Sequence, residues 1–108
     1  MANTFKLKTK ANVGVTTVGI YTAPAATTTV VIGITMANTS GSGVNVGVGI
    51  ARTSAEDIKL LKNAPIPQGS SLEFMAGNKV VLEATDTLTV DSDTNNSVDA
   101  ALTIMEIT

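Results

Sequence analysis

The chain is predicted to be an all-β protein, an antiparallel and jelly-roll-like β-sandwich of about eight short strands, in one domain covering residues 1–108. Apolar residues recur at every second position in several short runs, as in strands with one buried face. Turn formers separate these runs at intervals of about 8–12 residues, as in sandwiches and jelly rolls. The chain is also rich in Val and Thr, which suit a pleated, half-buried surface.

The expected strands follow from the alternating runs. In chain order, their apolar members are Phe5 and Leu7; Val18 and Ile20; Val30, Ile32, Ile34 and Met36; Val44, Val46, Val48 and Ile50; Leu72 and Phe74; Val80 and Leu82; Leu88 and Val90; and Val98, Ala100, Leu102 and Ile104. Each set is expected to share one face of its strand. The connecting turns are expected at residues 23–25, 38–43, 65–69, 76–78 and 91–97, and at Asp86.

One stretch fits two structures. Residues 53–56 begin like a helical capping box, but the apolar residues that follow alternate as in a strand. Pro65 and Pro67 then favour an extended backbone. We predict a loop at residues 53–56 and a strand at residues 57–63, with a one-turn helix as the alternative. Gly69 is expected to take a positive φ in a tight bend.

Several classes of function are disfavoured by composition. The chain has no Cys and no His, so thiolate and imidazole metal sites and disulfides are absent. No carboxylate or hydroxyl pair stands in a recognisable catalytic arrangement, so we expect neither an enzyme nor a cofactor. The net charge of −2 argues against nucleic-acid binding. The first residues do not resemble a signal peptide, and no apolar run is long enough to cross a membrane.

The low charge content predicts a covered surface. Only 15% of residues are charged, while 44% are hydrophobic. The surface of a free monomer usually carries more charge than this. We therefore expect another subunit to cover part of the outward surface.

Residues 91–99 begin like a calcium-binding loop. The candidate ligands, with oxygen atoms at alternate positions, are Asp91, Asp93, Asn95 and Asp99. However, the sixth position is Asn96 rather than Gly, and the twelfth is Leu102 rather than Glu. A solvated hairpin loop is the favoured interpretation, and no metal is expected.

Two strand faces are candidates for subunit contacts. The polar or small face of residues 44–51 is made of Asn45, Gly47, Gly49 and Ala51, and glycine within a strand often marks the close approach of another backbone. That approach would come either from a second subunit or from packing within the chain. Met105 and Ile107 make the second face of the last strand apolar as well, as in a strand covered on both sides.

Single side chains add to these candidates. Tyr21 and Arg52 are expected to be interface anchors, with ordinary packing as the alternative for Tyr21. Three lysines, Lys6, Lys8 and Lys10, are expected on the outward face of the first strand, where they would block wrong strand pairing. Contact with an acidic neighbour or with DNA is the alternative role for these lysines.

Six segments resemble a known group of proteins. They are Tyr21–Pro24, Thr27–Ile34, Ala37–Thr39, Leu60–Leu72, Lys79–Val90 and Ser97–Ile107. Together they are similar to small virion structural proteins of tailed bacteriophages. Thr85 stands where such turns frequently have Gly.

The resemblance implies a non-enzymatic β-sandwich, located in the virion after assembly in the host cytoplasm. We expect a homo-oligomer, a trimer or ring, docked on other virion proteins, with no nucleic-acid or membrane partner. Capsid decoration or cement is the favoured role, and a neck, tail or baseplate component is the alternative. A receptor- or carbohydrate-binding module is the rival class, although only Phe5, Tyr21 and Phe74 are aromatic and two of these are expected to be internal.

Overall fold

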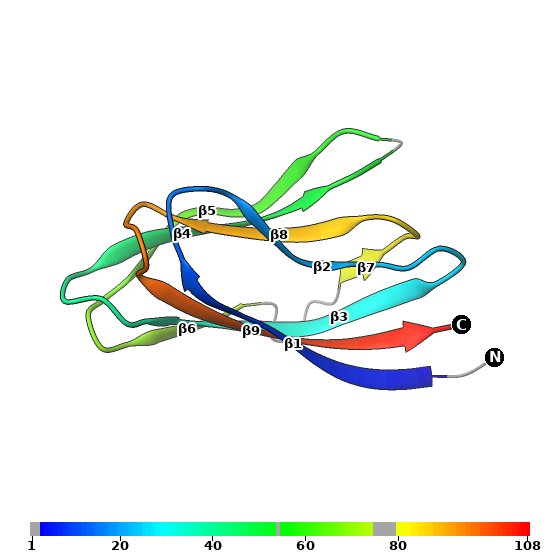
Figure 1. Cartoon of the computed structure of the whole chain (residues 1–108), viewed down its shortest axis with the longest axis horizontal. Coiled ribbons are helices and arrows are strands. Elements are labelled where there is room, and N and C mark those ends of the chain that lie inside the picture. Colours follow the sequence, from blue (N-terminus) through cyan, green and yellow to red (C-terminus); the bar gives the residue numbers. More distant parts are fainter. Residues whose placement is uncertain (1–2, 54, 75–79) are drawn as a thin grey trace.

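The computed structural model describes residues 3–53, 55–74 and 80–108, which form nine β-strands and contain no helix (Figure 1). The strands are β1 (Asn3–Val13), β2 (Val18–Thr22), β3 (Thr28–Asn38), β4 (Val44–Ala51), β5 (Ile58–Ile66), β6 (Ser71–Phe74), β7 (Val80–Leu82), β8 (Thr87–Ser92) and β9 (Val98–Ile107). The all-β prediction is therefore confirmed. The strand expected at residues 57–63 is confirmed as part of β5, which extends to the first of the two prolines and one residue beyond.

The strands form two antiparallel sheets that pack face to face (Figure 1). The first sheet has the order β1-β9-β3-β6, with β7 also paired to β3, and the second has the order β2-β8-β4-β5. Since β6 and β7 pair with successive parts of β3, they act as one interrupted strand. Counted in this way, the order is that of a jelly roll, so the predicted architecture is confirmed. The molecule measures 45 × 25 × 22 Å.

The core between the sheets is aliphatic, and the alternation in β4, β8 and β9 matches the sequence prediction. Its buried members from these strands are Val44, Val46, Val48, Ile50, Leu88, Val90, Val98, Ala100, Leu102 and Ile104. Leu72 and Phe74 of β6 pack against this cluster from the edge, as expected. Each buried Val, Leu or Ile side chain contributes about 1.5–3 kcal/mol.

A β-bulge changes the predicted face of β3. The pairing of β3 with β9 shifts register between Val31 and Gly33. Val31 and Ile34 are buried, whereas Val30 and Ile32 are only partly buried on the outward side. The prediction that Val30 and Ile32 share the face of Ile34 is thus wrong, because the extra residue of a bulge reverses the alternation.

A second register shift, between Gly19 and Tyr21 of β2, turns Tyr21 into the core. The Tyr21 side chain is only 7% exposed. Its predicted role as an interface anchor is therefore wrong, and the alternative of ordinary packing holds.

The faces of β1 are the reverse of those predicted. Lys6, Lys8 and Lys10 pair directly with Ile104, Leu102 and Ala100, which point into the core, so the lysines lie on the inner side of the sheet. Phe5 and Leu7 point outward and are 68% and 65% exposed. The reason is the register with β9, which brings Lys6 to the buried Glu106 at 2.9 Å.

The turns largely follow the sequence. Gly69 has the expected positive φ of 73°, in a turn where the Ser70 N–H donates to the Pro67 carbonyl at 3.1 Å. Thr85 takes a φ of 71°, the conformation that a glycine would adopt without strain. Residues 53, 55 and 56 form neither helix nor strand, while the turn expected at residues 76–78 lies outside the described residues.

Candidate interaction surface

The outward face of the first sheet carries a cluster of large apolar side chains. Phe5 of β1 pairs with Met105 of β9, Met105 pairs with Val30 of β3, and Val30 pairs with Val81 of β7. Directly opposed residues of an antiparallel sheet point to the same side. The neighbours of Met105 and Val30 along β9 and β3 are buried, so this row points to the outside. We call the group Phe5, Leu7, Val30, Val81, Met105 and Ile107 the apolar ridge.

The ridge is well exposed. Phe5, Leu7 and Val81 are among the exposed large hydrophobic residues, and Val81 is 54% exposed. Met105, Ile107 and Val30 are partly buried. None of the six ridge residues is charged, and Lys6 and Glu106, the charged residues next to Phe5 in β1 and Met105 in β9, lie on the opposite side of the sheet. A contiguous apolar surface of this kind usually marks a contact with another protein.

The same face becomes hollow towards the other end of the strands. Two shallow depressions of about 270 and 340 Å³ lie on either side of the pair Thr35–Ala101. Their remaining lining includes the small or short residues Gly33, Thr103, Thr9, Ala11 and Ala37. The larger Ile32, Ile34 and Phe74 line the depression beside β6, and Glu73, Lys10 and Asp99 stand at the borders. We call this half of the face the small-residue floor.

The structure places Met105 and Ile107 where the sequence indicated, on the outward face opposite the core residues of β9. Phe5, Leu7, Val30 and Val81, which complete the ridge, were not expected there from the sequence. The two apolar faces of β9 were the one signal in the sequence that could have located it.

The glycine face of β4 is covered by the chain itself. A Cβ atom on Gly49 would lie 2.8 Å from the carbonyl oxygen of Ile58, and one on Gly47 would lie 2.6 Å from Oδ1 of Asp91. Both glycines are buried, and the pairing of β4 with β5 shifts register beside them. The close approach predicted from the glycines occurs, but within the chain, so these two residues are not available to a subunit. Asn45 is exposed and Ala51 is partly exposed at the ends of this face.

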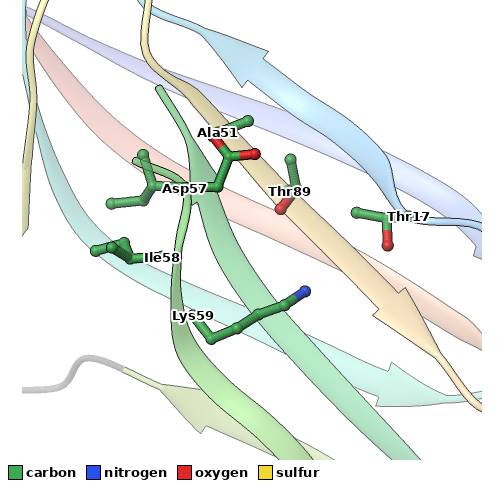
Figure 2. A pocket seen from close by; sticks show the side chains of 7 residues that line it. Thr17, Ala51, Asp57, Ile58, Lys59 and Thr89 are labelled. Atoms are coloured by element: carbon green, nitrogen blue, oxygen red, sulfur yellow. The ribbon is translucent and has the colours of Figure 1, made fainter. Parts of the chain in front are cut away.

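A shallow pocket of about 290 Å³ lies beside this strand (Figure 2). Figure 2 shows the side chains of Thr17, Asp57, Lys59 and Thr89 around it. Lys59 and Thr17 both contact Oδ2 of Asp91, at 3.6 and 3.0 Å, and Asp57 accepts a hydrogen bond from the Arg52 amide. Because Thr17, Lys59 and Asp57 are already engaged by Asp91 and by the Arg52 backbone, the pocket offers few free polar atoms to a ligand.

Arg52 is engaged within the chain. Its guanidinium group forms ion pairs with Glu83 and with Asp86, the latter at 3.3 Å. The anchor role predicted for Arg52 is therefore taken by an internal contact between the β4–β5 and β7–β8 connections.

The acidic segment at residues 91–99 does not assemble as a calcium loop. Asp91 lies on the outward side of the second sheet, whereas Asp99 lies on the outward side of the first. Asp93 accepts a hydrogen bond from the backbone N–H of Asn45 at 3.1 Å, and Asp99 accepts one from the backbone N–H of Asn12 at 3.0 Å. The segment, which includes Asn95, connects the two sheets rather than forming the expected hairpin. Among the described residues, no three acidic side chains are grouped so that they could hold a metal ion.

One polar cluster is buried beneath the ridge. The Tyr21 hydroxyl donates to Oε2 of Glu106 at 2.5 Å, and the Thr29 hydroxyl donates to Tyr21 at 2.9 Å. Lys6 pairs with the other oxygen of Glu106. The Tyr21 hydrogen bond, followed by that of Lys6, lowers the pKa of Glu106. Burial, followed by the contact with Glu106, raises the pKa of Tyr21 to about 12. These groups satisfy one another, so the cluster fixes β1 and β2 against β9.

Comparison with known proteins gives one informative result. No family model matches the sequence, and no curated protein is similar to it. The fold is similar to that of a chain in the crystal structure of the T13 IBDV viral particle, with a TM-score of 0.54 and 13% sequence identity. The alignment covers 96% of this chain and 30% of the viral one, so this chain spans about a third of that protein. At this identity, the likeness concerns the fold alone.

No helix that could cross a membrane occurs in the described ranges.

Proposed function

We propose that this chain is a non-enzymatic virion structural protein that associates with itself and docks on other virion proteins. The observation that carries the proposal is the exposed, uncharged apolar ridge on the first sheet. Burial of such a surface against a neighbouring subunit is the main favourable term in protein association. The role is mechanical, because buried apolar area holds the neighbours together without any chemical step.

The fold supports this class of function without defining it. Jelly rolls occur in viral capsid proteins but also in lectins and cupins, so a site must decide between them. The likeness to a chain of a viral particle agrees with a place in a virion. The segments resembling tailed-phage proteins favour a phage particle, with capsid decoration or cement ahead of a neck, tail or baseplate position.

Particles purified from cells that carry the encoding genome test the proposal. Quantitative mass spectrometry is expected to find the chain at a fixed number of copies per particle, unchanged by a high-salt wash that removes loosely bound protein. Cryo-electron microscopy of the same particles would then give the position. Absence of the chain from washed particles would refute the proposed function.

A carbohydrate-binding module is the second candidate, because Phe5 is an exposed aromatic ring of the kind that stacks on sugars. However, the neighbours of Phe5 in its row are Met105 and Val30, which supply no polar group to orient a sugar. This surface is better suited to a protein. Specific binding on a glycan array that is lost in a Phe5→Ala variant would favour the carbohydrate function instead.

A further inference from the structure

The two halves of the outward face of the first sheet are complementary in shape. Along β9, the outward residues are Met105 in the apolar ridge, Thr103 in the middle and Ala101 in the small-residue floor. Large side chains thus protrude at one end of the face, and shallow depressions of about 270 and 340 Å³ lie at the other. We consider a two-fold axis that lies in the plane of the contact, perpendicular to the strands, and passes through Thr103. Rotation about this axis reverses the direction of the strands, so the ridge of each copy lies on the floor of the other.

The distribution of charge suits the same arrangement. In a two-fold contact the same patch appears on both copies, so any charge near the axis would meet its own kind. Leu7, Thr103 and Gly33 form the central row, and all are uncharged. The bordering charges, Glu73, Lys10 and Asp99, are exposed and lie at the floor end, away from the axis, where they can stay hydrated at the rim of the contact.

The number of residues on this face is also adequate. The sheet has five strands, and its outward face supplies about twenty residues, near the roughly 20–30 residues a side of a standard protein interface. The ridge alone would be too small, so the floor must take part in the contact.

We propose that the outward face of the first sheet binds the same face of a second copy of this chain, with the apolar ridge of each copy seated on the small-residue floor of the other. The inference rests on the self-association in the proposed function and gives it a surface and a symmetry. It replaces the trimer or ring expected from the sequence with a two-fold pair.

The free edge of β1 is the main competing route to a dimer. Pairing of two β1 edges in antiparallel fashion would bring the rows Lys6, Lys8 and Lys10 of both copies against each other. Like charges on opposed strands are destabilising. Face-to-face packing avoids this repulsion, since Lys6 and Lys8 lie on the inner side of the sheet and Lys10 only borders the floor.

Cysteine cross-linking tests the geometry directly. The natural chain has no Cys, so a single introduced thiol reports on one position. Thr103 is exposed and lies on the proposed axis, so Thr103→Cys is expected to give a disulfide-linked dimer under mild oxidation. Asn45→Cys is the control, because Asn45 is also exposed but lies on the outward side of the second sheet. Linkage at Asn45 and not at Thr103 would overturn the proposal.

The mass in solution gives a second measurement on the full chain. Sedimentation equilibrium is expected to show two copies for the natural protein and at least tenfold weaker association for Leu7→Lys, which would place two ammonium groups near the axis. Val15→Lys is the matched control, because Val15 is 56% exposed in the β1–β2 connection and its replacement should leave association unchanged. Circular dichroism would confirm that both variants are folded.

The possible outcomes separate this inference from the proposed function. A natural protein that stays monomeric at about 100 µM, forms trimers, or responds equally to both lysine variants would overturn the two-fold pair. Such a protein could still be present in purified particles, which would leave the virion role intact. Conversely, a cross-linked pair that is absent from particles would refute the virion role and retain the inference.

Discussion

Addition of one methyl group at Gly49 should destabilise the fold because the space above this residue is already filled. A Cβ at Gly49 would lie 2.8 Å from the Ile58 carbonyl oxygen, 3.2 Å from the Thr89 hydroxyl and 3.4 Å from Cδ of Lys59. The first contact is with backbone, so β5 itself must move. By contrast, a Cβ at Gly41 would have no atom within 4 Å. Gly41→Ala is therefore a matched control for the same chemical change.

The expected magnitude follows from two opposing terms. Overpacking of this kind costs about 1–3 kcal/mol. Replacement of a strand glycine by alanine returns about 0.5–1 kcal/mol of conformational entropy. The net loss for Gly49→Ala is thus about 0.5–2 kcal/mol, which lowers the Tm of a domain of this size by roughly 2–16 °C. Gly41→Ala should leave the Tm unchanged or raise it slightly.

Thermal unfolding followed by far-ultraviolet circular dichroism measures both variants. All proteins must be compared at the same concentration, because association makes the Tm depend on concentration. An unchanged Tm for Gly49→Ala, together with a change of mass in solution, would refute the reasoning and return the glycine face to the list of subunit contacts.

Other predictions concern the buried polar cluster and one strained turn. Tyr21→Phe removes a hydrogen bond to the charged Glu106 and should lower the free energy of unfolding by about 1.5–3 kcal/mol in urea titrations, whereas no change would mean that the bond is not formed. Since the folded-state pKa of Glu106 is lowered, its contribution to stability is complete above the ordinary value of 4.5 and is lost as the pH falls through the lower folded value. Glu106→Gln should therefore flatten the acid side of the stability profile, and an unaltered profile would contradict this assignment. The pKa of Tyr21 is raised from 10.0 to about 12, so its contribution is complete below pH 10.0 and is lost as the pH rises through about 12, a loss that Tyr21→Phe should abolish. Thr85→Gly should raise the free energy of unfolding by about 0.5–1 kcal/mol, because Thr85 has a φ of 71°, and a lower stability would show that its side chain matters more than its backbone strain.

The core of the fold could be predicted to the residue in β4 and β9. In these strands the alternation continues without interruption on the core face, so the hydrophobic core residues read from the sequence are the observed ones. The positive φ of Gly69 was also predicted from the sequence, because it is a local property of the turn. The strand at residues 57–63 was also predicted, since two following prolines favour an extended backbone.

The candidate site was predicted only in part, and the errors have a common cause. Met105 and Ile107 were recognised because both faces of β9 are apolar. Val30 was assigned to the wrong face because a bulge near Gly33 reverses the alternation in β3. Tyr21 was expected at an interface rather than in the core because a register shift between Gly19 and Tyr21 changes the alternation in β2. A bulge depends on the pairing with a strand that is distant in the sequence, so it cannot be predicted from the periodicity of one segment.

Sequence alone thus determined that the chain forms strands that pack as two sheets around an apolar core, because the alternation of apolar residues is a property of each segment by itself. Only the tertiary structure decided which strands are neighbours, that Phe5 and Leu7 face outward, and that the lysines of β1 face inward. These features depend on the register between β1 and β9, which are joined through Glu106 and Lys6 at opposite ends of the chain. Register is a property of two strands together, and a shift by one residue would exchange their faces.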